Sequence, residues 1–136
     1  MENEVRIPIN SDRDVVTARQ KCRGMASELG FASTDVTLIA TAISELARNI
    51  VEHAGHGEIV LNLLRLREKT GICIVARDDG PGIADIAQVM RDGYSSRKSL
   101  GLGLPGTRRI VDEFDIISQV GRGTTVTIKK WHHNGV

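Results

Sequence analysis

The sequence lacks a strong excess of charge and any long apolar run, and each lack excludes a class of protein. Its 136 residues carry 18 basic and 17 acidic side chains, so no strong electrostatic field favours nucleic acid or an anionic membrane as a partner. No apolar run approaches transmembrane length, and the N-terminal MENEVRIPIN is acidic where a signal peptide would be basic. We therefore expect a cytoplasmic protein that binds neither nucleic acid nor membrane.

Cysteine is also scarce. Cys22 and Cys73 lie far apart in the sequence, each within an apolar segment. This pattern suits reduced intracellular thiols better than the disulfide framework of a secreted domain. The length fits one domain of ordinary size, and no linker, repeat or low-complexity tract interrupts it, so we expect residues 1–136 to form a single domain.

The apolar pattern predicts alternating strands and helices. Ser11, with Asp14 three residues later, resembles a capping box, and Ser33 is positioned to cap a second helix. The predicted elements are strand 5–9, helices 11–29 and 33–55, strands 58–66 and 71–78, a weak helix 83–92, a helix 104–114, and strands 114–120 and 124–131. Their order predicts an α+β, two-layer sandwich, with helices on one face of a mixed, mostly antiparallel sheet.

The second predicted helix carries a carboxylate and an amide at one edge. Its apolar stripe consists of Ile39, Ile43, Leu46 and Ile50. Glu45 and Asn49, four residues apart, share the flank of that stripe. One interpretation is a helix edge that meets water, with Glu45 paired to Arg48 at i+3. The other is chemical, because Glu can accept a proton and the Asn carbonyl can bind Mg²⁺.

A second group of polar residues follows a predicted buried strand. The segment ARDDGPGI places Asp78 and Asp79 before a turn that contains Gly80 and Gly82. Asp and Gly are the commonest turn residues, so the segment can be an ordinary turn. Similarly, GRGT at 121–124 can be a plain hairpin turn.

The segment GLGLPG precedes a predicted helix and favours an anion site. Glycine lets backbone N–H groups approach an anion, and the helix dipole favours negative charge there. The pattern lacks both the strand that precedes a Rossmann fingerprint and the Gly-Lys-Ser/Thr of a P-loop. The polar, glycine-rich segment DGYSSRKSLGLG before the helix is a candidate lid, in which Arg97 and Lys98 either contact phosphate or are solvated loop charges.

Four motifs, ELARN, DDGPG, GLGLPG and GRGT, therefore occur in order within the predicted elements. This arrangement resembles the GHKL ATPase superfamily, which includes DNA gyrase, histidine kinases and the MutL proteins, and the resemblance covers nearly the whole chain. It implies the Bergerat fold, with ATP and Mg²⁺ bound.

The resemblance also implies roles for individual residues in proton transfer, in Mg²⁺ binding and in adenine recognition. Glu45 is implied as the general base, Asn49 as the Mg²⁺ ligand and Asp78 as the carboxylate that hydrogen-bonds the adenine amine. Gly80 and Gly82 would let the backbone lie close to the base. Thr124 is implied as the hydroxyl near the adenine. The glycines of the phosphate loop are implied to be Gly101, Gly103 and Gly106, and Lys98 is a cation of the implied lid. Pro105 departs from an open glycine loop and stiffens the helix entry.

Within this superfamily the chain resembles the small serine/threonine kinases of bacterial partner switching, through TAISELARNI, DGPGI, GLGLPG, DEF and IKKW. The resemblance implies phosphorylation of STAS-domain proteins of the RsbS and RsbR type in a stress-response (stressosome) pathway, with an RsbU-like phosphatase downstream. About thirty residues precede the ELARN helix, which leaves no room here for the phosphoacceptor helices of a histidine kinase. The kinase motifs H-R-D and D-F-G are absent.

Two other functions fit the same residues. One is an anti-sigma factor of the RsbW type, which shares the kinase chemistry but captures a sigma subunit. The other is a non-catalytic ATP-binding module that switches partners by lid closure. Retention of Glu45 disfavours the module, because nucleotide binding alone needs no base.

Overall fold

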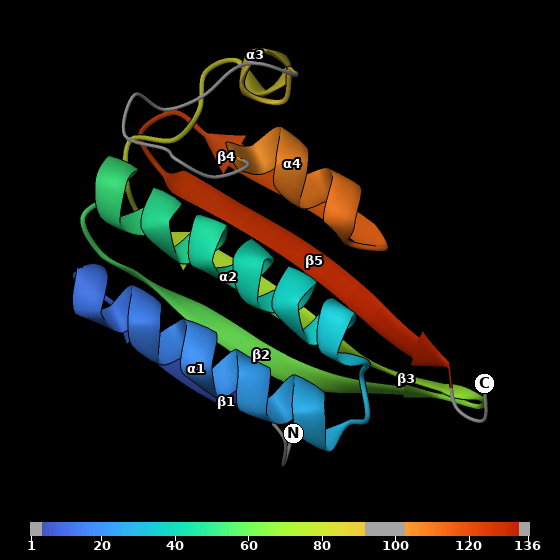
Figure 1. Cartoon of the computed structure of the whole chain (residues 1–136). Helices are drawn as coiled ribbons and strands as arrows, with labels where there is room; N and C mark the ends of the chain where they lie inside the picture. The colour runs from blue at the N-terminus through green and yellow to red at the C-terminus, as the bar shows by residue number, and fades with distance from the viewer. Residues whose placement is uncertain (1–3, 92–102, 134–136) are drawn as a thin grey trace.

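The computed structural model describes residues 4–91 and 103–133 of the chain (Figure 1). The predicted order of strands and helices is confirmed within these residues. The elements in chain order are β1 (Val5–Ile9), α1 (Asp12–Glu28), α2 (Ser33–His53), β2 (Gly57–Leu66), β3 (Lys69–Asp78), α3 (Ile86–Val89), α4 (Gly103–Ile110), β4 (Glu113–Gln119) and β5 (Gly123–His133).

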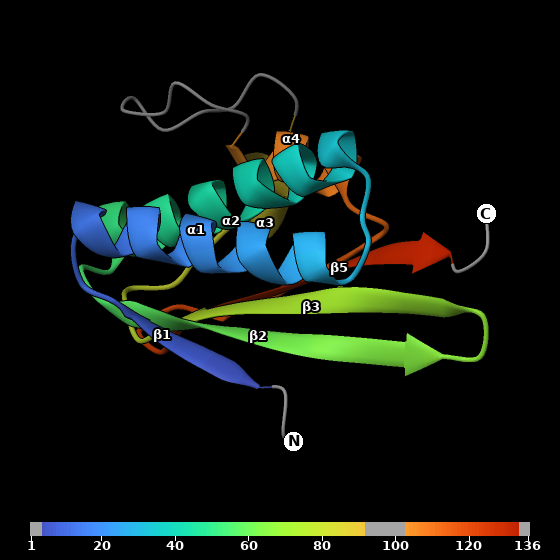
Figure 2. The same cartoon turned by 60° about the horizontal axis from the view of Figure 1, so that its bottom comes forward.

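The five strands form one sheet in the order β1-β2-β3-β5-β4. Each neighbouring pair is antiparallel, so the sheet is antiparallel throughout rather than mixed. The helices α1, α2 and α4 lie over the same face of the sheet (Figure 2). The predicted α+β, two-layer fold is therefore confirmed.

The core lies between the helices and the face of the sheet that they cover. The predicted α2 stripe is buried, with Ile39, Ile43, Leu46 and Ile50 each at most 2% exposed. In β3 the alternate residues Ile72, Ile74 and Ala76 belong to the same core cluster, as the two-residue period of a strand requires. Burial of these branched side chains is the main force that holds α2 against the sheet.

The last predicted helix was too long. We expected it to run to residue 114, but α4 ends at Ile110 and β4 begins at Glu113. In β4 Phe114, Ile116 and Ser118 are half-buried whereas the residues between them are exposed. This alternation has the period of a strand, and pairing with β5 satisfies the backbone. The weak helix predicted over 83–92 is only the single turn of α3.

One strand boundary and the cap predictions also need correction. The strand predicted from Gly71 begins earlier, at Lys69, and Gly71 pairs with Leu64 within β3. Neither α1 nor α2 has a side-chain cap at its N-terminus. Asp14 instead accepts a hydrogen bond from the backbone N of Asn10 at 2.7 Å, and Ala32 rather than Ser33 occupies the cap position of α2.

Within residues 4–91 and 103–133, none of the helices combines the length and the apolar content that a membrane span requires.

Candidate active site

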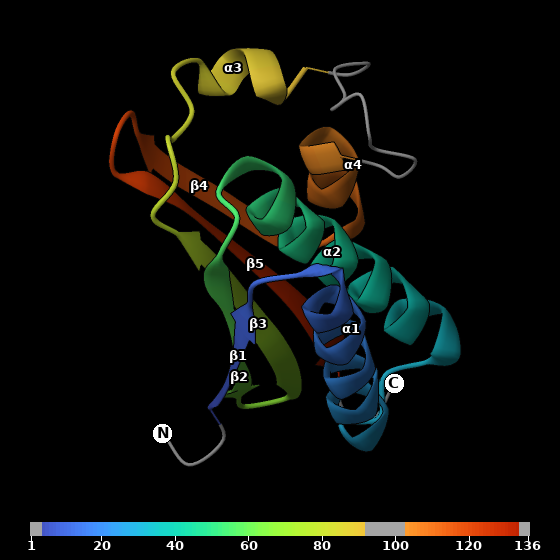
Figure 3. The same ribbon diagram turned by 90° about the vertical axis from the view of Figure 1, so that its left-hand side faces the viewer.

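A cavity of about 380 Å³ lies beside the second half of α2. Its walls come from α2, the ends of β3 and β5, the segment between β3 and α3, and the first residues of α4. Figure 3 shows the chain after β3 passing the C-terminal end of α2 to reach α3, with α4 alongside α2. The cavity is thus enclosed by segments from both halves of the sequence.

Asp78 and Thr124 meet at one end of this cavity. Asp78 is the last residue of β3, and the register of β3 and β5 pairs it directly with Thr124. Both residues line the cavity. The Oδ1 atom of Asp78 accepts a hydrogen bond from the backbone N of Gly80 at 2.9 Å, so the carboxylate turns the chain as well as facing the cavity.

Three glycines at this end occupy positions where a side chain does not fit. Gly82 has φ of 78°, and a Cβ there would collide with the backbone of Gln119. Gly123 has φ of 114°, and its Cβ would collide with the carbonyl of Asp78. A Cβ on Gly80 would lie 2.6 Å from a side chain at the end of α2. The glycines therefore let three backbone segments approach each other closely.

The β4–β5 turn holds the segment that follows Asp78. The backbone N of Gly121 donates to the carbonyl of Pro81 at 2.8 Å, and the backbone N of Ile83 donates to Ser118 Oγ at 2.7 Å. GRGT is thus a hairpin turn, as its residues alone allow, and it also supports the cavity wall. We did not predict Ser118; the register of the hairpin, which places it opposite Thr124, would have identified it.

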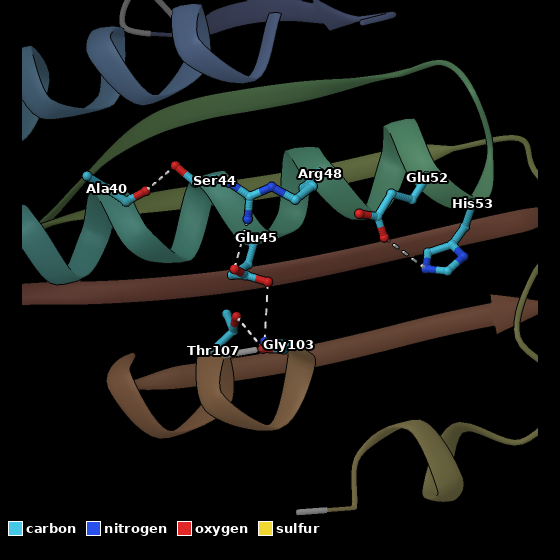
Figure 4. Close-up of polar contacts among 8 residues, drawn as sticks. All are labelled: Ala40, Ser44, Glu45, Arg48, Glu52, His53, Gly103 and Thr107. Carbon is cyan, nitrogen blue, oxygen red and sulfur yellow. Dashed lines mark hydrogen bonds and ion pairs between the residues drawn. The ribbon is translucent and has the colours of Figure 1, made fainter. Parts of the chain in front are cut away.

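Glu45, on α2, does not line the cavity itself but contacts Gly103, which does (Figure 4). Glu45 is 4% exposed. Its Oε2 pairs with the Arg48 guanidinium at 2.9 Å, and its Oε1 accepts a hydrogen bond from the backbone N of Gly103 at 3.2 Å. The i+3 ion pair expected for a helix edge is therefore present. The edge does not meet water, because the start of α4 packs against the carboxylate.

Asn49 lines the cavity one helical turn after Glu45, and His53 lines it one turn later. Three polar side chains thus follow one edge of α2 at four-residue spacing. We did not predict His53, although the same spacing would have identified it. Its Nε2 lies 3.9 Å from the carboxylate of Glu52.

The glycine-rich segment is only partly described. Gly103 begins α4 with φ of 67° and lines the cavity. Gly106 is buried within α4, one turn further on, so it lies inside the helix rather than in the loop that precedes it. Pro105 lies in the first turn, where its missing N–H costs little. Gly101 and Lys98, like the rest of the predicted lid, lie outside the described residues.

The side chains around Asn49 fit Mg²⁺ only if a bound ligand supplies further oxygen atoms. Asn49 lines the cavity, and its side chain carries one amide oxygen. The described residues contain no group of three or more His, Cys, Asp or Glu side chains that could hold a metal ion by themselves. Mg²⁺ commonly binds through few protein oxygens together with nucleotide phosphates and waters, and Asn49 suits that mode.

The chain matches the family model of the histidine kinase-like ATPase domain over residues 9–130. The chain belongs to the histidine kinase-like ATPase family. The predicted membership of the GHKL superfamily is thereby confirmed. Among family members, the chain is 47% identical over 131 residues to the serine/threonine-protein kinase RsbT of Bacillus subtilis (strain 168), covering 96% of this chain and 98% of RsbT. The predicted resemblance to partner-switching kinases agrees with this relative.

Other family members are more distant. The anti-sigma F factor of Clostridium novyi (strain NT) is 32% identical over 120 residues, which cover 83% of this chain and 82% of that protein. The RsbU and RsbW domains of Rv1364c from Mycobacterium tuberculosis have a TM-score of 0.64 at 20% identity, over 96% of this chain and 33% of theirs. The mycobacterial sensor histidine kinase MprB has a TM-score of 0.55 at 17% identity, over 96% and 99%. These two structures support the fold alone.

Proposed function

We propose that the chain is an ATP-dependent protein serine/threonine kinase that phosphorylates STAS-domain proteins in a bacterial stress-response partner switch. One observation carries the proposal. A single cavity runs from Asp78 and Thr124 at the strand ends to Asn49 on α2, and the buried Glu45 lies one helical turn from Asn49. The cavity therefore combines a base-binding end with Asn49, and Glu45 contacts the lining residue Gly103 from just behind it.

The relatives support the same activity. RsbT, named as a serine/threonine-protein kinase, is 47% identical over almost the full length of both chains. By analogy with partner switching, the phosphorylated products would be STAS-domain proteins of the RsbS and RsbR type. The kinase would then pass the signal to an RsbU-like phosphatase.

In this proposal the cavity binds ATP with its adenine toward Asp78. The carboxylate accepts a hydrogen bond from the adenine amine, and the close packing of Gly80 against Ala54 and of Gly82 against Gln119 fixes the wall around the ring. The phosphates extend along α2 toward Asn49 and the start of α4. There the N-terminal end of the helix favours negative charge. Gly101 and Lys98 would complete the phosphate contacts.

Asn49 would hold Mg²⁺ together with the phosphates. When bound, the ion neutralises the charge that develops on the transferred group. The protein supplies the remaining requirements, which are orientation of the acceptor hydroxyl and a place for its proton.

Glu45 would take that proton. The hydroxyl oxygen of the acceptor serine or threonine bonds to the γ-phosphorus, the bond from this phosphorus to the β–γ bridging oxygen breaks, and ADP leaves. A carboxylate offers about four lone-pair sites, and Glu45 uses two of them for Arg48 and Gly103 N. The other two can accept the hydroxyl proton without loss of either contact.

Incubation of the purified chain with Mg-ATP and a STAS-domain protein tests the proposal. We expect one phosphorylated serine or threonine on the partner, mapped by mass spectrometry, and none when ATP is replaced by ADP. ATP binding without any transfer would instead support a non-catalytic switch module. Absence of ATP binding would reject the nucleotide site as well.

An anti-sigma factor is the second candidate. The 32% identity to an anti-sigma F factor favours it. Pull-down of a sigma subunit by the ATP-bound chain, together with transfer to its STAS partner, would support this candidate over a kinase that acts on STAS-domain proteins alone.

A further inference from the structure

Ser118 connects three parts of the cavity wall through one hydroxyl group. It accepts a hydrogen bond from the backbone N of Ile83 at 2.7 Å. It lies 3.0 Å from the carbonyl oxygen of Gly123 and 2.8 Å from Thr124 Oγ1. Ser118 does not itself line the cavity, whereas Thr124 does. Any effect of Ser118 on a ligand must therefore pass through its neighbours.

The chemistry of the partners decides the direction of each hydrogen bond. A serine hydroxyl has one proton and two lone pairs. The Ile83 amide can only donate, so it uses one lone pair. The Gly123 carbonyl can only accept, so it takes the single proton of Ser118. The contact with Thr124 must then use the second lone pair, and Thr124 is its donor.

The opposite direction is disfavoured. If Ser118 donated to Thr124, the Gly123 carbonyl would face an oxygen lone pair at 3.0 Å with no hydrogen between them. Gly123 is buried, so the two facing lone pairs would repel each other with little screening by water. The arrangement in which Thr124 donates satisfies all four groups.

We infer that Ser118 is a positioning residue that determines base specificity, because it takes the Thr124 hydroxyl proton and leaves only lone pairs facing the cavity. Thr124 pairs directly with Asp78 across β3 and β5, and a carboxylate also presents only acceptors. This end of the cavity therefore selects a ring that carries an amino group and rejects one that carries a keto oxygen. The inference rests on the proposed nucleotide function and adds the physical origin of its selectivity.

The comparison of ATP with inosine triphosphate tests this inference, because inosine has a keto oxygen where adenine has its amine. Dissociation constants for both Mg-nucleotides are measured by calorimetry on the full chain and on Ser118→Ala. In the variant the Thr124 proton is free to rotate toward a keto oxygen. We expect the preference for ATP over inosine triphosphate to fall about fivefold to tenfold, the equivalent of one hydrogen bond.

A double-mutant cycle separates this effect from a simple loosening of the Ile83 segment. Thr124→Val removes the hydroxyl, so Ser118→Ala added to it should change the nucleotide preference by less than about twofold. Ser118→Thr retains a hydroxyl and should retain the wild-type preference. If Ser118→Ala does not fold, Ser118→Cys replaces it, because a thiol is a weak acceptor.

The outcomes distinguish this inference from the proposed function. An unchanged preference in Ser118→Ala, or an equal change in the Thr124→Val background, overturns the role of Ser118 while ATP binding and the kinase proposal stand. Failure of the wild-type chain to bind ATP overturns the proposed function itself.

Discussion

The two ends of the cavity are built from different kinds of contact. At the Asp78 end, three residues lie side by side on neighbouring strands, because the register pairs Asp78 with Thr124 and Thr124 with Ser118. At the Glu45 end, α4 packs against the core through Leu104 and Ile110, and the backbone N of Gly103 donates to Glu45. The first end is held by continuous backbone pairing, and the second by side-chain packing with one hydrogen bond 3.2 Å long.

This difference matches different chemical tasks. Recognition of a base needs donors and acceptors at fixed positions, and paired strands provide them with little freedom. Phosphoryl transfer needs groups that adjust as the acceptor hydroxyl arrives, and a contact between the middle of α2 and the start of α4 can change without breaking the sheet. We therefore expect substitutions at the first end to alter nucleotide affinity and substitutions at the second to alter the transfer rate.

Glu45→Gln should give the largest effect and tests this separation most strongly. The amide is similar in size but takes up the proton poorly, so we expect transfer to a STAS-domain partner to slow by about 10²–10⁴-fold. The dissociation constant of ATP, measured by calorimetry, should change by less than about twofold, because the proposed role concerns the acceptor hydroxyl.

Glu28→Gln on α1 is the matched control, because Glu28 is exposed and lies on a helix outside the cavity. It should leave both quantities unchanged. Loss of ATP affinity in parallel with transfer in Glu45→Gln would show that the two ends are not separable.

Gly82→Ala should give the next largest effect, on stability. Gly82 has φ of 78° and its Cβ would meet the backbone of Gln119, so we expect a loss of about 2–4 kcal/mol in unfolding free energy. Gly121 also has a positive φ, of 82°, but open space surrounds its Cβ position.

Gly121→Ala is therefore the control for backbone strain alone, and we expect it to lose about 1–2 kcal/mol in unfolding free energy. Urea denaturation measures both variants. The difference between them reports the contact between the segment after β3 and the β4–β5 hairpin. Equal losses would mean that this contact contributes nothing to the Asp78 end.

Asp78→Asn should weaken ATP binding by about 1–3 kcal/mol, because an amide can present its NH₂ group where the adenine amine needs an acceptor. The adjacent Asp79→Asn changes the same charge at an exposed position and should bind ATP normally. An Asp78→Asn chain with wild-type affinity would remove this carboxylate from the base site.

Cys22 supplies a reference region that neither end of the cavity touches. It is 0% exposed on the buried face of α1, and burial raises the pKa of its thiol from 9.0 to about 12. Above the thiol pKa of the unfolded chain, the Cys22 thiol loses its proton in the unfolded chain but keeps it in the folded chain. The free energy of unfolding therefore falls as pH rises. Relative to Cys22→Ala, the wild type should lose about 1.4 kcal/mol between pH 8 and pH 10.

Urea denaturation of the two chains at both pH values measures this difference. Saturating Mg-ATP should stabilise both chains equally and leave the difference unchanged. A difference that vanishes would show that Cys22 becomes exposed in the native state.

Much of the fold followed from local pattern. The α2 stripe, the apolar run of β3 and the β-branched residues of β5 predicted their own elements, because each pattern is typical of one regular structure. The helix predicted over 104–114 was too long because the apolar residues of this segment suit a helix. Pairing of Phe114 with Ile128 on β5 places its last residues in a strand instead. Pairing between distant residues overrides such weak local preferences.

The sequence by itself identified the candidate residues for chemistry. The spacing of Glu45 and Asn49 follows from helix geometry alone, and the motif order identified the family. Only the tertiary structure decided which of these groups meet. The pairing of Asp78 with Thr124, the contact of Glu45 with Gly103 and the contact of Ser118 with Thr124 join residues from separate elements. Local periodicity carries no information about such distant partners, because packing and strand register select them when the whole chain folds.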